Sequence, residues 1–489
     1  MGHMQKKWWT LIAVCVGMFM LLIDVTIVIV AQPTIQQELG ASLTDVQWVV
    51  DAYALTLASL LLTAGVLADR YGRKLLFQIG LVIFTLGSLL CGIAQDPLML
   101  VLSRAAQGVG GAIMFAVSLA LLGHSFRGKD RGTAFGVWGA IAGIAVALGP
   151  VLGGVIVSEW SWRGIFLVNV PIGVMAVAVT AWRVEESRSP HPTPPDWAGF
   201  VTLTAGLVSL IYGLIRAGER SWSDVGVIIC LALAVAFLGS FIFTERRTAH
   251  PMFDLSLLRV PTFSGGAIAA FTMNGSLYAL LLYLVIYLQD ILGYSALGAG
   301  LRIAVLSGAT FVSSALAGRF SQRVPARWLI GPGLALVGVG LFLMAGLTGS
   351  WSHFIPGFIV SGLGAGMVNP PLASTAIGVV RPEKAGMASG VNNTFRQVGM
   401  ATGIAAFGSV FRTHGLNDLF WIAGAIALAG SVCAFTLIRS RDFLHHAPAG
   451  AGAAPSGAAP AAAASPVAAT TPTPPATPAP SQKSRTSHQ

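Results

Sequence analysis

The sequence predicts an all-α polytopic membrane protein. Of its 489 residues, 55% are hydrophobic and only 10% are charged, and its mean hydropathy is +0.75. A soluble domain carries about 25% charged residues. Apolar runs of about 20 residues, the length that crosses the hydrocarbon core of a bilayer, recur along most of the chain. These observations exclude a water-soluble globular protein and make the lipid bilayer its surroundings.

The apolar runs predict fourteen transmembrane helices. In chain order they lie near residues 8–31, 46–68, 75–95, 98–123, 133–157, 163–183, 197–216, 222–244, 261–290, 297–320, 327–348, 353–379, 385–411 and 417–438. The first run is too long for the apolar region of a signal peptide, so we expect it to be the first span. Residues 441–489 are rich in alanine, proline and threonine, and we expect a disordered cytoplasmic tail because this composition cannot bury a core.

The positive charges predict that both termini lie in the cytoplasm. Each connection from an even-numbered to an odd-numbered helix carries at least two lysine or arginine residues. The opposite connections hold only Arg163, Arg216, Arg220 and Arg412. Because lysine and arginine are enriched in cytoplasmic loops, we expect a multi-pass protein of the inner or plasma membrane. The net charge of +10 then serves topology, and we expect no nucleic-acid partner.

An internal repeat predicts the domain organisation. Gly65 and Gly318 begin the similar loops GVLADRYGRK and GRFSQRVPAR, and Gly132 and Gly386 match in a second pair of loops at nearly the same offset. We therefore expect six-helix bundles in residues 1–183 and 261–440, with two inserted linker helices in residues 184–260. Transporters built from such repeats bind substrate near the midplane between the halves. Chance similarity of Gly/Ala-rich helices is the alternative.

Several motifs resemble the major facilitator superfamily. GVLADRYGRK at 65–74 resembles its loop between helices 2 and 3, VLSRAAQGVGGAI at 101–113 its helix-4 motif, and GIAVALGPVLGG at 143–154 its helix-5 antiporter motif. With LIDVTIVIVAQPTI at 22–35 and fourteen spans, the chain is similar to the fourteen-helix drug:proton antiporters. The resemblance implies multidrug efflux and antibiotic resistance through a proton-coupled antiporter that exports hydrophobic or cationic small molecules by alternating access.

The resemblance also implies a conformational latch in the loop between helices 2 and 3. Its residues are Gly65, Asp69, Arg70, Gly72 and Arg73. We expect Gly65 and Gly72 to allow close backbone approach and a tight turn, and Asp69 to face a helix N-terminus, where a carboxylate is favoured. For the basic residues, topology charges alone are the alternative.

A second glycine-rich segment lies in the fifth helix. It contains Gly143, Gly149, Pro150, Gly153 and Gly154. The resemblance implies that this segment seals or hinges the central cavity of an exporter, and a mid-helix proline introduces a kink. Ordinary close packing of helices through small residues is the alternative.

Two acids and one arginine are candidates for proton coupling. Asp24 lies about 24 Å along the first helix from Trp8, where a charged side chain costs about 2.5–3.5 kcal/mol. We expect Asp24 to take up and release protons, with a structural salt bridge as the alternative. Arg104 keeps its charge in the membrane and is the expected partner of Asp24. Asp51 is a second candidate, expected near the outer interface, where it either couples protons or is simply hydrated.

Polar residues within apolar spans should face a cavity or another helix. We expect the substrate cavity to be lined by Asp24, Gln107, Asn274, Tyr278, Asn393, Arg396 and Gln397. Packing is the alternative for the aromatic members. We expect no cofactor and no metal, because neither a ligand cluster nor a Walker-type loop is present. We also expect a monomer with no enzymatic activity.

A different substrate range is the main alternative for function. A dedicated exporter of an endogenous metabolite, antibiotic, amino acid or lipid would have the same fold. A non-transporting sensor is disfavoured because the sequence contains no sizeable soluble domain.

Overall fold

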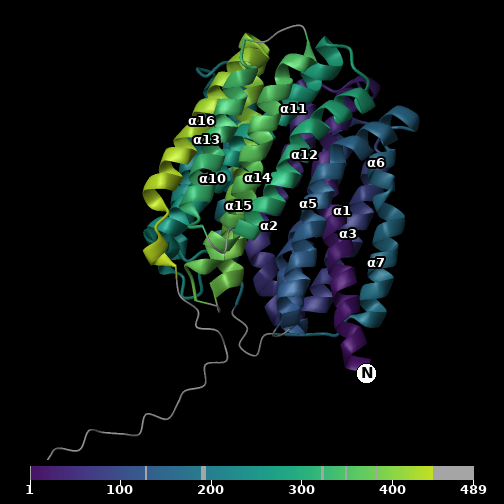
Figure 1. Cartoon of the computed structure of the whole chain (residues 1–489), viewed down its shortest axis with the longest axis vertical. Helices are drawn as coiled ribbons and strands as arrows, with labels where there is room; N and C mark the ends of the chain where they lie inside the picture. The colour runs from purple at the N-terminus through teal and green to yellow at the C-terminus, as the bar shows by residue number, and fades with distance from the viewer. Residues whose placement is uncertain are drawn as a thin grey trace, which may run out of the picture. The chain divides into compact units, whose positions relative to one another are not determined.

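The computed structural model describes residues 2–126, 129–188, 194–320, 324–346, 350–381 and 384–443. Every regular element among these residues is helical (Figure 1). Residues 444–489 of the predicted tail lie outside the described residues. The tail was expected to begin at residue 441, but Asp442 belongs to a short 3-10 helix, η6 (Ser440–Asp442), and accepts a 2.7 Å hydrogen bond from the Thr262 hydroxyl. The ordered chain therefore extends past the predicted boundary.

The N-terminal bundle contains the first six predicted spans. Its helices are α1 (Gly2–Leu39), α2 (Leu43–Tyr71), α3 (Arg73–Gly92), α4 (Pro97–Ser125), α5 (Lys129–Glu159), α6 (Gly164–Leu167) and α7 (Asn169–Arg183). Helix α1 continues through Pro33, α5 continues through Pro150, and α6 and α7 together occupy the sixth span. Ser42 and Asp45 form a capping box that begins α2, an arrangement that satisfies two free backbone N–H groups.

The two inserted helices are α8 (Trp197–Glu219) and α9 (Val225–Arg247). Asp196 and Asp224 cap their N-termini by accepting hydrogen bonds from the backbone N–H groups of Gly199 and Val227. Helix α8 packs against α2 and α15, and α9 packs against α8. A 3-10 helix, η1 (Leu255–Arg259), leads to the next span.

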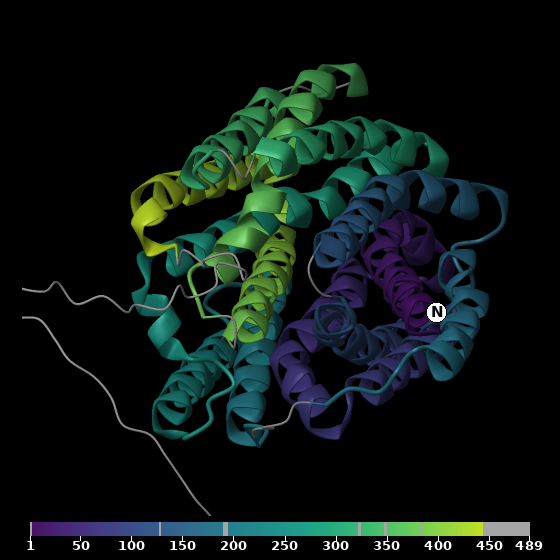
Figure 2. The same ribbon diagram turned by 60° about the horizontal axis from the view of Figure 1, so that its bottom comes forward.

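The C-terminal bundle begins with a composite span. This span contains α10 (Pro261–Met273), the π-helical turn η2 (Asn274–Tyr278), α11 (Ala279–Ile286) and the π-helical turn η3 (Tyr287–Ile291). The remaining elements are α12 (Ala296–Phe320), α13 (Arg327–Met344), η4 (Trp351–Phe354), α14 (Ile355–Gly378), α15 (Ala385–His414) and α16 (Leu416–Leu437). Figure 2 shows the purple-to-blue helices of the N-terminal bundle beside the green-to-yellow helices of the C-terminal bundle.

Thirteen helices among the described residues are long and apolar enough to cross a membrane. Helix α15, predicted as the thirteenth of the fourteen spans, is not among them. Its polar cluster at 392–397 makes it less apolar than its neighbours, but it packs against α2, α8 and α10. Protein rather than lipid therefore covers much of its surface, which allows a polar helix within the bundle.

The two bundles contact each other through two matched helix pairs, α2 with α15 and α5 with α12. Each pair joins the second helix of one bundle to the fifth helix of the other, as expected for duplicated halves. Hydrogen bonds join the bundles at the end that carries residues 40–42 and 292–295, among them one from Arg412 Nη2 to Thr44 Oγ1 at 2.7 Å. The Gln289 amide donates to the Val30 carbonyl at 2.8 Å, and the Leu297 backbone N–H donates to Ser158 Oγ at 3.1 Å.

Candidate functional site

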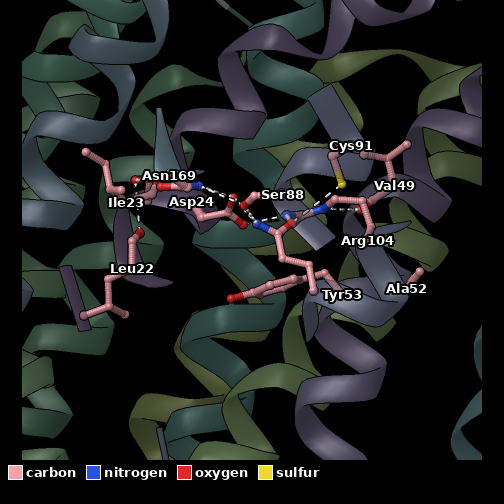
Figure 3. Close-up of polar contacts among 12 residues, drawn as sticks. Leu22, Ile23, Asp24, Val49, Ala52, Tyr53, Ser88, Cys91, Arg104 and Asn169 are labelled. Atoms are coloured by element: carbon pink, nitrogen blue, oxygen red, sulfur yellow. Dashed lines mark hydrogen bonds and ion pairs between the residues drawn. The ribbon is translucent and has the colours of Figure 1, made fainter. Parts of the chain in front are cut away.

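Asp24 and Arg104 form an ion pair in the interior of the N-terminal bundle. Arg104 Nη1 lies 2.5 Å from Asp24 Oδ2, and the two side chains are 1% and 0% exposed. The same Nη1 donates to Gln107 Oε1 at 2.7 Å, and Gln107 Nε2 donates to Asp24 Oδ1 at 2.8 Å. Helix α1 therefore contributes Asp24, and helix α4 contributes Arg104 and Gln107, to one cluster. Figure 3 shows Asp24 and Arg104 pointing toward each other.

Ser88 and Asn169 complete this cluster from α3 and α7. Gln107 Nε2 donates to Ser88 Oγ at 2.7 Å, and Asn169 Nδ2 donates to Ser88 Oγ at 3.3 Å and to Asp24 Oδ1 at 3.4 Å. Neither residue is among those predicted from the sequence. Their only signal is that each is a polar residue in an apolar run, and Ser88 is too common in membrane helices to single out.

The surroundings of Arg104 preserve its charge. Its guanidinium carbon lies 4.2 Å from the centroid of the Tyr53 ring and 5.8 Å from that of Phe166. Its Nε donates to the Val49 carbonyl at 3.1 Å. Arginine stays protonated in proteins, and aromatic faces attract cations, so the positive charge of Arg104 is fixed and Asp24 supplies the negative charge that balances it.

Asp51 lies in α2, on the side of the N-terminal bundle that meets the C-terminal bundle. It is 0% exposed, and neither carboxylate oxygen has a hydrogen-bond partner among the described residues. One turn earlier, Gln47 donates to the Tyr283 hydroxyl at 2.9 Å and to the Ile404 carbonyl at 3.1 Å. The alternative that Asp51 is simply hydrated is wrong, because α11 and α15 cover this face of α2. The position of Asp51 along the helix did not reveal this covering.

An apolar cavity lies between the two bundles. In this conformation it encloses about 20 Å³, which is about the space of one water molecule. Its walls come from α1, α5, η2, α11 and α12, through Thr26, Ile29, Val30, Pro150, Tyr278, Leu281, Ile303, Leu306, Ser307 and Thr310. Of the predicted cavity residues only Tyr278 lines it, whereas Asp24 and Gln107 are enclosed in the N-terminal bundle.

A second polar cluster lies behind Tyr278 in the C-terminal bundle. Arg396 Nη2 donates to Asn369 Oδ1 at 3.1 Å, and Asn369 Nδ2 donates to the Tyr278 hydroxyl at 3.3 Å. Asn274 and Asn393 bond instead to backbone carbonyls one turn earlier on their own helices. Asn369 is not among the residues predicted from the sequence, because it directly precedes Pro370 and Pro371 and so resembles part of a turn.

A helical distortion accompanies this cluster. Asn274 and Tyr278 begin and end the π-helical turn η2, a type of element that often marks functional sites. Gly275 packs against α15: a Cβ there would lie 2.9 Å from the Gly399 carbonyl oxygen. Because η2 is held this closely, Tyr278 is fixed at the cavity wall.

The loop between α2 and α3 is held by contacts within the N-terminal bundle. Asp69 accepts hydrogen bonds from Arg73 at 2.7 and 2.9 Å. The N-terminus of α3 is met by Glu186, whose carboxylate accepts from the backbone N–H groups of Lys74 and Leu75 at 3.0 and 3.1 Å. The expectation that Asp69 faces this helix terminus is therefore wrong: Glu186, from the segment after α7, occupies that position.

The two glycines of this loop differ. Gly72 has φ +127°, and a Cβ there would lie 2.7 Å from the Glu186 carboxylate, so glycine is required on both grounds. At Gly65, a Cβ would meet no described atom within 4 Å. The expectation of a tight turn is confirmed at Gly72 by its positive φ, whereas the expectation of close backbone approach is wrong for Gly65. The Arg70 guanidinium lies over the neighbouring Tyr71 ring, 5.7 Å from its centroid.

The small residues of α5 contact both α1 and α12. A Cβ at Gly149 would overlap Thr26 Oγ1 of α1, and one at Gly153 would lie 2.9 Å from the Ile27 carbonyl oxygen. A Cβ at Gly154 would lie 2.7 Å from Leu297 Cα of α12.

The other two members of the α5 segment differ in how closely they pack. The Pro150 carbonyl oxygen meets Gly300 of α12 so closely that no Cβ would fit at Gly300. Gly143 has more room, with only the Phe311 ring within 4 Å of a Cβ. Close packing of α5 with α12 is therefore concentrated at the end near Gly154.

Comparisons with known proteins agree with this arrangement. A family model described as Major Facilitator Superfamily matches residues 14–404 and 263–473. The multidrug resistance protein Stp of Mycobacterium tuberculosis is 36% identical over 403 residues, covering 82% of this chain and 75% of that protein. The methylenomycin A resistance protein of Streptomyces coelicolor is 33% identical over 436 residues, covering 87% and 91%.

A solved structure supports the fold. The structure of the human organic anion transporter MFSD10 aligns with a TM-score of 0.62 at 14% identity, covering 88% of this chain and 99% of that chain. At this identity the likeness concerns the fold alone. Taken with the family match over most of the sequence, the chain belongs to the Major Facilitator Superfamily.

Proposed function

We propose that this multi-pass membrane protein is a proton-driven exporter of hydrophobic or cationic small molecules. Relatives named as a multidrug resistance protein, a drug efflux pump and several antibiotic resistance proteins support export of drugs. The apolar lining of the cavity between the bundles supports hydrophobic cargo, which the cavity would admit only after the bundles move apart. The observation that carries proton coupling is the buried Asp24–Arg104 pair, because it is a titratable acid shielded from water beside that cavity.

The link between the pair and the cavity is helix α1. Thr26, which lines the cavity, lies two residues beyond Asp24 and packs on Gly149 of α5. Protonation of Asp24 would remove the negative charge that holds Arg104 and release one side of the cluster. A change in α1 would then reach the cavity wall and the α1–α5 contact, so proton uptake and substrate binding compete through one helix.

The conformation described here fits one stage of alternating access. Asp24 is 0% exposed, so it exchanges protons only when the bundles tilt and open the cluster. Close contacts between the bundles lie near Ser158 and Leu297, at the end we assign to the outside. Asp69 pairs with Arg73 within its own loop, so the proposed latch is not engaged with the C-terminal bundle in this state.

The remaining assignments follow from the same proposal. We place the bundle boundaries at residues 1–183 and 261–440, with 184–260 as the inserted pair. Both termini lie in the cytoplasm, since the positively charged connections share that side. Protons and a small molecule are the exchanged partners, and a monomer suffices because cavity and acid belong to one chain.

Vesicles provide the test. In energised inside-out vesicles containing the protein, a lipophilic cationic dye should accumulate, and collapse of the proton gradient with an uncoupler should abolish the accumulation. Accumulation that persists after the gradient is collapsed would rule out proton coupling.

A dedicated exporter is the second candidate. Relatives named for single compounds, methylenomycin A, tetracenomycin C and puromycin, favour a narrow substrate range. Competition decides between the two: several structurally unrelated drugs should each inhibit dye export by a multidrug pump, whereas a dedicated exporter would be inhibited by one chemical class.

A further inference from the structure

We infer that Arg396 is an anion-binding site, so that the substrates include apolar molecules carrying a carboxylate or another negative group. The inference rests on the proposed export function and specifies the cargo of the same cavity. The observation behind it is that Arg396, in α15, has no acidic partner among the described residues.

The charge of Arg396 is uncompensated within its own bundle. None of the ion pairs among the described residues involves it. In the sequence from 261 to 437 the only acids are Asp290, Glu383 and Asp418. Asp290 and Asp418 lie close to the ends of their spans, and Glu383 lies outside the described residues. Arginine cannot shed its proton to relieve the cost of an unpaired charge in the membrane. An arriving anion would relieve it.

An acid of the other bundle does not fill this role here. Asp51 in α2 faces the same interface, but neither of its carboxylate oxygens accepts a hydrogen bond from a described residue. Arg396 and Asp51 thus lie on opposite bundles, and neither has a partner of opposite charge among the described residues. A substrate anion at Arg396 and a proton on Asp51 would leave neither site with an unbalanced charge.

The guanidinium has donors left to offer. One N–H of Nη2 is used by Asn369, and Nε is buried without a hydrogen-bond partner. The side chain is half-buried, so part of it remains accessible. A planar guanidinium with spare donors is suited to bind a carboxylate through two hydrogen bonds.

A relay of polar groups connects this donor to the cavity. Arg396 donates to Asn369, and Asn369 donates to Tyr278, which lines the cavity. The opposite walls are apolar, with Ile29 and Leu306 among them. Once the bundles move apart and widen this cavity, it would suit a molecule whose apolar body contacts these walls while its acid group lies toward Arg396.

A matched pair of probes tests this assignment. Pyrenebutyrate and its pyrenebutyl-trimethylammonium counterpart share one apolar body and carry opposite charges. Binding to the purified full-length protein is measured at neutral pH by energy transfer from tryptophan to pyrene. In Arg396→Gln the Kd of the acid should rise about 10- to 100-fold, while the Kd of the cation stays unchanged, and Arg396→Lys should retain most of the affinity for the acid.

Arg302→Gln is the control. Arg302 is another membrane-helix arginine whose Nε lacks a hydrogen-bond partner, but its guanidinium stacks 3.5 Å from the Tyr294 ring centroid and 4.9 Å from that of Trp351. We expect no selective effect on the acid. A second measurement needs no variant: the wild-type protein should bind pyrenebutyrate about tenfold more tightly than its uncharged methyl ester.

Several results would overturn the inference. These are equal weakening of both probes in Arg396→Gln, equal wild-type binding of acid and ester, or the same loss in Arg302→Gln. Parallel loss of both probes in Arg396→Gln and Asp51→Asn would show that the two residues pair with each other in another state. A protein that exports the cation but fails these tests contradicts the anion site alone. Selective binding of the acid without any gradient-driven export contradicts the proposed function alone.

Discussion

Asp24→Asn removes a charge while keeping the shape of the side chain. The asparagine oxygen still accepts a hydrogen bond from Arg104 or Gln107, but the amide cannot exchange a proton. Arg104, 1% exposed, forms no other ion pair among the described residues and keeps its positive charge. The variant therefore separates the structural role of the acid from its role in proton exchange.

The stability effect follows from the buried pair. Removing one partner of a buried ion pair costs about 3–5 kcal/mol because the other charge is left uncompensated. For Asp24→Asn we expect a loss of stability at the lower end of this range, because the amide retains hydrogen bonds. Adding Arg104→Gln should recover part of the loss by removing the unpaired charge. The thermal unfolding temperature of the purified protein should therefore be lowest for the single variant and intermediate for the double variant.

The transport effect is larger. One proton entering in exchange for one uncharged substrate supplies about 2.3 kcal/mol per 100 mV and about 1.4 kcal/mol per pH unit. At 100 mV and one pH unit this sustains a substrate gradient of about 500-fold. Asp24→Asn should sustain none, although substrate exchange without a net gradient continues.

The assay is substrate accumulation in energised inside-out vesicles, with variant levels matched by immunoblot. Asp290→Asn is the control, because this exposed acid lies at the end of the ninth span and outside the cluster; it should accumulate substrate like the wild type. Concentrative transport by Asp24→Asn at normal protein levels would refute the assignment, as would an equal loss in Asp290→Asn.

Four further changes have defined outcomes. Gly149→Ala places a methyl group against Thr26 of α1 and should lower the transport rate at least about tenfold. Gly139→Ala, at a position with no described atom within 4 Å of an added Cβ, should leave the transport rate unchanged. Equal effects of the two variants would contradict the importance of the α1–α5 contact. Asp51→Asn removes a buried acid without a partner and should raise the unfolding temperature; a decrease would reveal an unseen partner. Glu186→Gln weakens the contact at the start of α3, and we expect faster proteolysis near residue 72; unchanged cleavage would argue against it. The hydrogen bond from Arg216 lowers the pKa of the Asp224 carboxyl, so this pair stays ionised from neutral pH down through pH 5. Asp224→Asn should therefore leave the pH profile of transport unchanged over that range. A shifted profile would contradict this.

The fold was predictable because lipid imposes a simple rule. Each span must be about 20 predominantly apolar residues long, so the positions of the apolar runs predicted the helices. The charges in the loops predicted the direction in which each helix crosses the membrane. Helix α15 shows where the rule weakens: its polar cluster is tolerated because α2, α8 and α10 cover it. The inward or outward face of a span is not encoded in its mean hydropathy.

The candidate site was only partly predictable for the same reason. Asp24 and Arg104 stand out as charges in apolar helices, and the structure brings them together. Ser88 and Asn169 join them only through the packing of α3 and α7, which no spacing within one helix reveals. Glu186 is a loop acid whose role depends on how the segment after α7 returns to α3.

Proton release on substrate binding tests competition at Asp24 most directly. If substrate and proton compete, linkage requires that each displaces the other. In weakly buffered solutions of the purified protein at successive pH values, saturating substrate should release up to about one proton per molecule at a pH where the substrate-free protein has taken up that proton. Asp24→Asn should bind the substrate and release none. Equal proton release by the wild type and by Asp24→Asn, or substrate binding by the wild type without any proton release between pH 5 and pH 8, would contradict the account.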